Sequence, residues 1–309
     1  MKPRTVDLRS KILWFGIALG LTCWPVIGGA APGVQMVFDD LSADLGPAFS
    51  VLLDEENELT FEVVSADGFK ERWGPGTGAA PNYGYSNSTH WHRVSIQLPE
   101  DRASNYLIEI DFAHIDEVNA YFVEDGQLTD TQKSGLLTPL GDRRISHRNI
   151  LFRLPLMLSD HLDIYISTRG ENAIQVPTTL WREDAFWAKE RHVQFFIALC
   201  LGAMLAMIIY NLFVYQATKD PLHLSFSQMT TSVGLAIATT YQVTYEYLWP
   251  DWPWFANRTV ALFIAFTGLT TLSFIRSYLE MASYSEKFDK IFKGLSVYFL
   301  VGLVLPFVV

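Results

Sequence analysis

The sequence predicts a two-part membrane protein, an all-β sandwich followed by an α-helical transmembrane bundle. Residues 193–215 carry no charge over 23 positions, and a helix of that length covers about 34 Å, enough to cross a bilayer core of about 30 Å. Short alternating apolar and polar runs precede this stretch, and further apolar stretches follow it. Such runs are typical of strands in a sandwich, so the two halves have different fold classes.

The N-terminus has the layout of a secretory signal peptide over residues 1–30. Lys2, Arg4 and Arg9 give a basic start, residues 12–27 are apolar, and small residues suited to cleavage follow. An uncleaved membrane anchor is the alternative. Either form delivers the chain after about residue 31 to the outside of the cell.

Residues 32–185 are predicted to form an extracellular or periplasmic β-sandwich. Several short strands separated by turn formers such as Asp67-Gly68 indicate antiparallel sheets. The predicted strands cover residues 59–64, 93–98, 106–111, 118–123, 150–154 and 162–167. The glycine-rich segment 73–88 is expected to be a loop or a lid. Both cysteines, Cys23 and Cys200, lie outside this domain, so no disulfide stabilises it.

The sandwich contains none of the common catalytic motifs, so we expect no enzyme activity, no catalytic residue and no cofactor. His90 and His92 alternate on a predicted strand and share one face, which makes a metal site one interpretation. We favour the other, in which Trp91 points into the core, the histidines point outward and no metal binds.

Acidic residues at a predicted strand end give a second catalytic alternative. Asp111, Asp116 and Glu117 are candidates for the carboxylate pair of a glycosidase. A solvated turn is the commoner explanation for such residues, and we favour it.

A small basic group in this acidic domain is the main candidate for ligand binding. Guanidinium groups bind anions and polar ligands through paired hydrogen bonds, although a solvated loop is the more frequent explanation. Aromatic residues of the glycine-rich segment are candidates for stacking on a sugar ring, with core packing as the alternative. The predicted ligand-binding residues are Trp91, Arg93, Arg143, Arg144, Arg148 and Tyr85.

Residues 186–309 are predicted to form the transmembrane region. The expected spans cover residues 193–215, 222–245, 255–275 and 291–309. The second span is rich in serine and threonine, which implies hydrogen bonds between helices. The loop 245–254 contains several tryptophan and tyrosine residues, which are typical of a membrane–water interface.

Basic residues give the orientation. Lys219 lies in the first loop and Lys287 and Lys290 lie in the third, so these loops are predicted to be cytoplasmic and the sandwich to lie outside. No isolated charge lies in the middle of a span, which disfavours a transporter. The formal net charge of −10 and the lack of a basic patch that could neutralise phosphates speak against nucleic-acid binding.

Several short motifs together resemble a known family. They are Tyr85-Ser86-Asn87, Trp91-His92-Arg93, residues 115–122, Gly135 before Arg143-Arg144, Val176-Pro177, Leu180-Trp181, Tyr210-Asn211-Leu212-Phe213, Asp220-Pro221-Leu222 and Tyr247-Leu248-Trp249-Pro250. In this order they resemble the bacterial seven-transmembrane receptors with diverse intracellular signalling modules (7TMR-DISM), from the type 2 extracellular sensor domain into the membrane region.

The resemblance implies a jelly-roll sandwich akin to carbohydrate-binding modules, whose task is to sense a small ligand. It also implies a multi-pass protein of the bacterial inner membrane, in contact with lipid, and a cytoplasmic output such as a cyclase or kinase. Because the sequence stops in its fourth span, we expect either a fragment or a truncated relative. A homodimer is compatible with this reading.

We therefore predict the input half of a membrane receptor for a small extracellular ligand, with carbohydrate among the candidates. The charged segment 181–191 is expected to form an amphipathic lead-in helix that couples the domain to the bundle. One alternative is a membrane-tethered carbohydrate-binding or hydrolytic envelope protein. The other is a structural subunit of an envelope complex.

Overall fold

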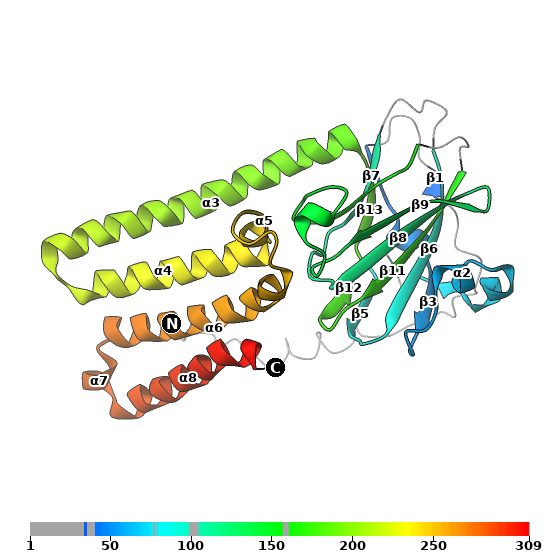
Figure 1. Ribbon diagram of the computed structural model, residues 1–309. Helices are drawn as coiled ribbons and strands as arrows, with labels where there is room; N and C mark the ends of the chain where they lie inside the picture. The colour runs from blue at the N-terminus through cyan, green and yellow to red at the C-terminus, as the bar shows by residue number, and fades with distance from the viewer. Residues whose placement is uncertain are drawn as a thin grey trace, which may run out of the picture.

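The computed structural model describes residues 34–35, 41–76, 78, 80–98, 105–156 and 161–308. It places a β-sandwich at one end of the molecule and a row of antiparallel helices at the other (Figure 1). We call residues 41–182 the head and the helices that follow the bundle. The predicted signal peptide, residues 1–30, lies outside the described residues.

The head is a sandwich of two mainly antiparallel sheets, as the sequence predicts. The larger sheet has the order β4 (Gly74–Pro75), β3 (Ser50–Asp54), β6 (Thr89–Gln97), β11 (His161–Arg169), β8 (Glu117–Glu124) and β9 (Gln127–Ser134), and β1 (Val34–Gln35) pairs in parallel with β6. The smaller sheet has the order β10 (Ile150–Arg153), β7 (Tyr106–Ile110), β13 (Thr178–Arg182) and β2 (Ser42–Asp44). A separate pair consists of β5 (Asn82–Tyr85) and β12 (Ala173–Gln175).

The core lies between the facing sides of the two sheets. Alternate residues of each strand point inward, so Ile164 on β11 and Phe122 on β8 are fully buried partners in register. Ile108 and Phe152 face them from the smaller sheet. Burying each of these side chains contributes about 1.5–3 kcal/mol, which explains how a domain without a disulfide holds together.

The strand predicted at residues 59–64 is wrong. The chain there forms a short helix, α2 (Phe61–Val64), followed by the 3₁₀ turn η2 (Asp67–Arg72). Phe61 and Val64 are three residues apart, so on a helix they share one face, and both are buried against the outer side of the larger sheet. The predicted loop 73–88 likewise contains the short strands β4 and β5.

The expected orientation of the β6 side chains is also wrong. His90 and His92 are 3% and 0% exposed and point into the sandwich, whereas Trp91 lies on the opposite side, beneath α2. The imidazole of His92 donates from Nδ1 to the carbonyl of Ile166 at 3.3 Å, and its Nε2 lies 3.1 Å from the hydroxyl of Tyr83. Burial lowers the pKa of His92 to about 3 and that of His90 to about 4, so both rings stay neutral.

The bundle follows directly after β13. Its elements are α3 (Glu183–Thr218), α4 (Pro221–Thr240), α5 (Val243–Tyr247), α6 (Pro253–Tyr278), α7 (Met281–Tyr284), α8 (Glu286–Val304) and the 3₁₀ turn η4 (Leu305–Phe307). Asp220 starts α4 by accepting a 2.9 Å hydrogen bond from the backbone N–H of Leu222, and Pro221 and Pro253 stand at first helical positions, where proline is favoured.

Among the described residues, three segments are long and apolar enough to cross a membrane: α3, α6 and residues 286–307. The second predicted span, residues 222–245, is not among them: α4 is long enough at 20 residues, but its many serine and threonine residues make it too polar. α4 nevertheless lies between α3 and α6 and runs antiparallel to both (Figure 1). The chain turns at 218–221 and 279–285 at the end of the bundle that is distant from the head.

Polar side chains join these helices, as the composition of α4 predicts. Ser232 on α4 and Thr270 on α6 place their hydroxyl oxygens 2.6 Å apart. His223 on α4 and Asn211 on α3 form a second bond at 3.0 Å. Other hydroxyls of α4 instead donate to a carbonyl one turn back, such as Ser227 to His223 at 2.9 Å. Only part of the polar content of α4 therefore joins helices.

The predicted lead-in helix is not a separate element. β13 extends to Arg182, and α3 then runs without interruption for 36 residues from the head into the predicted first span. One continuous helix therefore joins the head to the predicted first span.

Candidate ligand pocket and head–bundle junction

A polar pocket of about 520 Å³ lies between the head and the first turns of α6. Its volume falls within the range of small-molecule sites. The polar lining consists of Asn57, Asn87 and Asn257, the acidic Asp116, Glu117 and Glu171, and Arg169 and Arg258. Asn257 and Arg258 belong to α6, and the others belong to the head, so the pocket bridges the two parts of the molecule.

Asp116 is the centre of the hydrogen bonds behind this pocket. It is buried, and its carboxylate accepts the backbone N–H of Glu171 at 2.7 Å and the amide of Asn172 at 3.4 Å. Burial raises the pKa of Asp116, the hydrogen bond from Glu171 opposes this, and the charge of Glu171 adds to it. The amide of Asn172 also donates to Asn257 on α6 at 3.0 Å, which ties the pocket wall to the bundle.

Arg258 brings a positive charge to the bundle side of the pocket. Its guanidinium lies 4.4 Å from the centre of the Trp254 ring and donates to the carbonyl of that residue at 3.2 Å. Within the part of the chain that the structure describes, its buried Nε–H has no hydrogen-bond partner. A buried unpaired donor is costly.

Below the pocket, the segment between β9 and β10 contacts the bundle. Leu136 and Leu140 pack against Tyr245 and Ala256. The hydroxyl of Tyr245 donates to the carbonyl of Thr138 at 3.0 Å. Through these contacts, an apolar segment of the head packs against α5 and the start of α6.

Arg143 stabilises this segment from inside. It is buried and donates to the carbonyls of Thr138, His147 and Gly135 at 3.1, 3.1 and 2.7 Å, and its guanidinium lies 5.4 Å from the ring centre of Tyr245. Burial lowers the pKa of Arg143, but an arginine keeps its charge in proteins. Its donors are thus used to shape the junction.

Arg148 forms the main ion pair of the junction. It is 6% exposed and makes three hydrogen bonds of 3.0–3.1 Å to the carboxylate of Glu190 on α3, which is 1% exposed, and one of 3.3 Å to the carbonyl of Tyr241. His147 Nδ1 accepts the backbone N–H of Asn149 at 3.0 Å, and its Nε2 lies 3.4 Å from Glu190. Burial raises the pKa of Glu190, but His147 and Arg148 outweigh it and leave it lowered.

A second set of contacts seats α3 on the smaller sheet. Phe186 is buried against Leu107 and Leu151 on the outer side of β7 and β10. Lys189 donates to the buried carboxylate of Glu109 at 2.7 and 2.9 Å. The first turns of α3 are therefore part of the head as much as of the bundle.

The six predicted ligand-binding residues lie in separate places. Arg143 and Arg148 are in the junction, and Arg144 pairs with Asp130 on β9. Trp91 and Arg93 lie on the outer side of the larger sheet, where Arg93 pairs with Asp163 at 3.2 Å and lies 5.3 Å from the ring centre of Tyr165. Tyr85 is 84% exposed on β5. None of the six lines the polar pocket.

Sequence reasoning missed most of the pocket. Asp116 was assigned to a solvated turn, but the structure buries it. Asn57, Asn87, Arg169 and Asn257 come from four distant segments and carry no local pattern. Within the described residues, no group of three or more histidine, cysteine, aspartate or glutamate side chains is placed to hold a metal ion.

The comparison with protein families decides the identity. The model described as "7TMR-DISM extracellular 2" matches residues 46–182, and the model described as "7TM diverse intracellular signalling" matches residues 193–309. The chain belongs to the 7TMR-DISM family. It is accordingly a membrane protein with an extracellular N-terminal sensor domain. The ten residues between the two matches are the first turns of α3 in this 7TMR-DISM chain, where the junction contacts are made.

Two further comparisons add little. A search of curated proteins returned no match. The solved structures that match include TmCBM61 in complex with β-1,4-galactotriose, at 11% sequence identity and a TM-score of 0.27, covering 45% of this chain and 90% of that one. At such a TM-score we infer neither fold nor ligand from it.

Proposed function

We propose that this 7TMR-DISM chain is the input half of a multi-pass receptor in the bacterial inner membrane. It senses a small polar ligand, a carbohydrate among the candidates, and transmits the signal to a cytoplasmic output. The observation that supports this proposal is the polar pocket, because its lining comes from the head and from α6. A ligand bound there contacts both parts at once.

The coupling follows from that shared lining. A ligand shifts a conformational equilibrium only by its difference in affinity between the two states. Arg169 and Glu171 lie on the head side and Arg258 on the bundle side. A ligand that holds these side chains together favours one position of the head over α6, and α6 carries that preference across the membrane.

The lining also indicates the ligand class. Three carboxamides, three carboxylates and two guanidinium groups offer both donors and acceptors, and none of the lining residues is aromatic. Hydroxyl groups match mixed donors and acceptors, whereas stacking on a long polysaccharide needs an aromatic surface. We therefore propose a small hydroxyl-rich molecule that binds without being turned over.

Binding to the purified full chain tests this proposal. Thermal shift against a panel of monosaccharides, disaccharides and polyols should find a compound that raises the melting temperature. Arg169→Ala should weaken binding of that compound about ten-fold or more, because it removes a charged hydrogen-bond donor from the pocket. Arg144→Ala, at a predicted ligand residue outside the pocket, should leave binding unchanged.

The opposite effect of the two substitutions would place the ligand site elsewhere on the head. A loss of binding in Arg144→Ala with none in Arg169→Ala places the ligand at the basic group that the sequence indicates. No shift with any compound counts against small-ligand sensing. Release of reducing sugar from a polysaccharide by the full chain would favour the alternative, a membrane-tethered hydrolytic envelope protein.

A further inference from the structure

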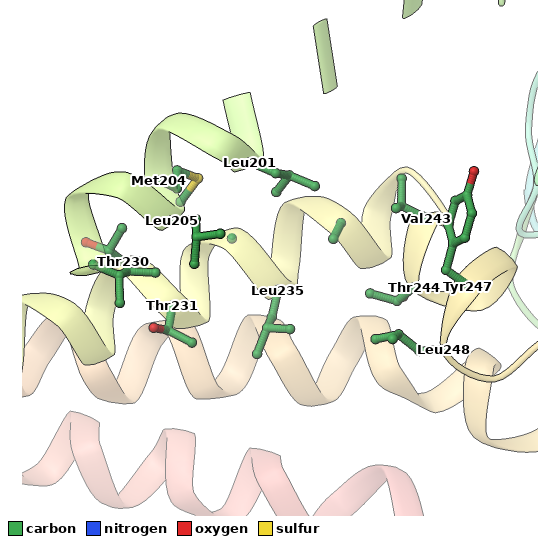
Figure 2. Close-up of a pocket in the computed structure, with 13 residues that line it drawn as sticks. Leu201, Met204, Leu205, Thr230, Thr231, Leu235, Val243, Thr244, Tyr247 and Leu248 are labelled. Carbon is green, nitrogen blue, oxygen red and sulfur yellow. The ribbon is translucent and has the colours of Figure 1, made fainter. Parts of the chain in front are cut away.

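A groove runs along the outside of the bundle between α3 and α4. It has a volume of about 380 Å³, and its lining is almost wholly apolar, with side chains from α3, α4 and α5 converging on it (Figure 2). Leu205, Tyr247 and Leu248 line it and are more than half exposed. Because α3 is a candidate membrane span, this groove faces the hydrocarbon of the bilayer.

The groove continues into a second cavity of about 320 Å³ at the head end of the bundle. Leu201, Val243 and Tyr247 line both cavities. The second cavity adds polar groups, among them Gln194 and Glu246. From Gln194 to Ile208 a helix rises about 21 Å, which is comparable to the depth of one leaflet with its headgroup.

The charged residues that line the polar end are Arg148 and Glu246. The guanidinium of Arg148 is already paired with Glu190. Glu246 adds a second carboxylate, and its buried Oε2 has no hydrogen-bond partner in the described part of the chain. Burial raises the pKa of Glu246, and the charges of His147 and Arg148 oppose this. Because the hydrogen bonds of Arg148 go to Glu190, the carboxylate of Glu246 is left at this end to accept from a cation that donates hydrogen bonds.

We propose that the groove binds a phospholipid with a primary ammonium headgroup, of the phosphatidylethanolamine type. The acyl chain lies between α3 and α4, and the ammonium donates to Glu246 at the head end. The lipid then contacts α3, α5 and the Arg148 side of the junction together, which makes it a structural ligand of the head–bundle contact. This inference does not depend on the polar pocket between the head and α6.

Native mass spectrometry of the purified full chain tests it. Dioleoyl phosphatidylethanolamine, phosphatidylcholine and phosphatidylglycerol are offered separately at equal concentrations. We expect phosphatidylethanolamine to bind about ten-fold more tightly than phosphatidylglycerol, with phosphatidylcholine between them because its ammonium has no N–H. Glu246→Gln should remove most of this preference, and Glu280→Gln, at the far end of the bundle, should not change it.

Filling the groove tests the position of the acyl chain. Gly234 on α4 lines the groove, and Gly202 on α3 has open space around it and does not line it. Gly234→Leu should weaken binding of all three lipids about ten-fold, whereas Gly202→Leu should have no effect. If Gly234→Leu does not fold, Thr231→Phe fills the same groove.

Several results would overturn the proposal. Equal binding of the three lipids, unchanged by Glu246→Gln, would disprove the headgroup site. Unchanged lipid binding in the groove-filling variants would disprove the acyl-chain site. A mass corresponding to two chains without lipid, lost in Gly234→Leu, assigns the groove to a second copy of the chain instead.

Discussion

The substitution Glu190→Gln tests whether the buried ion pair holds the head on the bundle. Glutamine keeps the shape of the side chain and removes the charge. Arg148, which is 6% exposed, then loses its ion-pair partner. Removing one partner of a buried pair costs about 3–5 kcal/mol, and three of the hydrogen bonds of Arg148 end on Glu190. We expect the melting temperature of the full chain to fall by about 10 °C.

Two matched variants separate charge from packing. Asp184→Asn breaks a more exposed pair between the first turn of α3 and Arg182 at the end of β13, and it should lower the melting temperature by less than about 2 °C. The double variant Arg148→Met with Glu190→Leu replaces the pair by apolar groups of similar size and should recover most of the loss.

Differential scanning fluorimetry in detergent measures all three variants. A shift of less than about 2 °C for Glu190→Gln would refute the reasoning, because the pair would then not be an effective buried contact. So would a double variant that is at least as unstable as Glu190→Gln, since the destabilisation would then not come from an unpaired charge.

Two further predictions concern the head. Gly135→Ala should destabilise the full chain by about 3 kcal/mol or more, because the backbone φ of Gly135 is +115° and a Cβ there would lie 2.5 Å from the carbonyl oxygen of Asp116. The control variant Gly68→Ala has open space around it and should be nearly neutral in the same thermal unfolding assay. Acid should also destabilise the head. The folded pKa values of His90 and His92, about 4 and about 3, lie below the ordinary 6.5, so their contribution is complete above pH 6.5 and is lost as the pH falls toward 3. A melting temperature that stays constant from pH 7 to 4 would contradict this.

Much of the fold is predictable from the sequence because its signals are local. The alternation in residues 106–111 and 162–167 matches β7 and β11 closely, and the apolar stretch 193–215 lies within α3. The errors arise where tertiary contacts outweigh local pattern. Residues 59–64 alternate like a strand, but burying Phe61 and Val64 together on the sheet requires a helix.

The candidate site is less predictable for the same reason. The sequence indicates a ligand site at the basic group 143–148, but Arg143 donates to backbone carbonyls and Arg148 pairs with Glu190, and neither lines the polar pocket. Whether the histidines or the tryptophan of β6 point into the core depends on the strand register, and a shift by one residue exchanges the two faces of the strand. Asn257 joins the pocket only because the head docks on α6, which no local pattern encodes.

The account depends most on one contact, the docking of an extracellular head on the start of α6. Cross-linking in intact cells measures it directly, with Asn172→Cys and Asn257→Cys in a chain whose own Cys23 and Cys200 are replaced by serine. A short, membrane-impermeant bifunctional maleimide added outside the cells should join these two positions, whose native side chains are 3.0 Å apart, and should not join Asn172→Cys to Ser283→Cys at the far end of the bundle. Failure to join the first pair from outside, or joining only after lysis, would contradict the account.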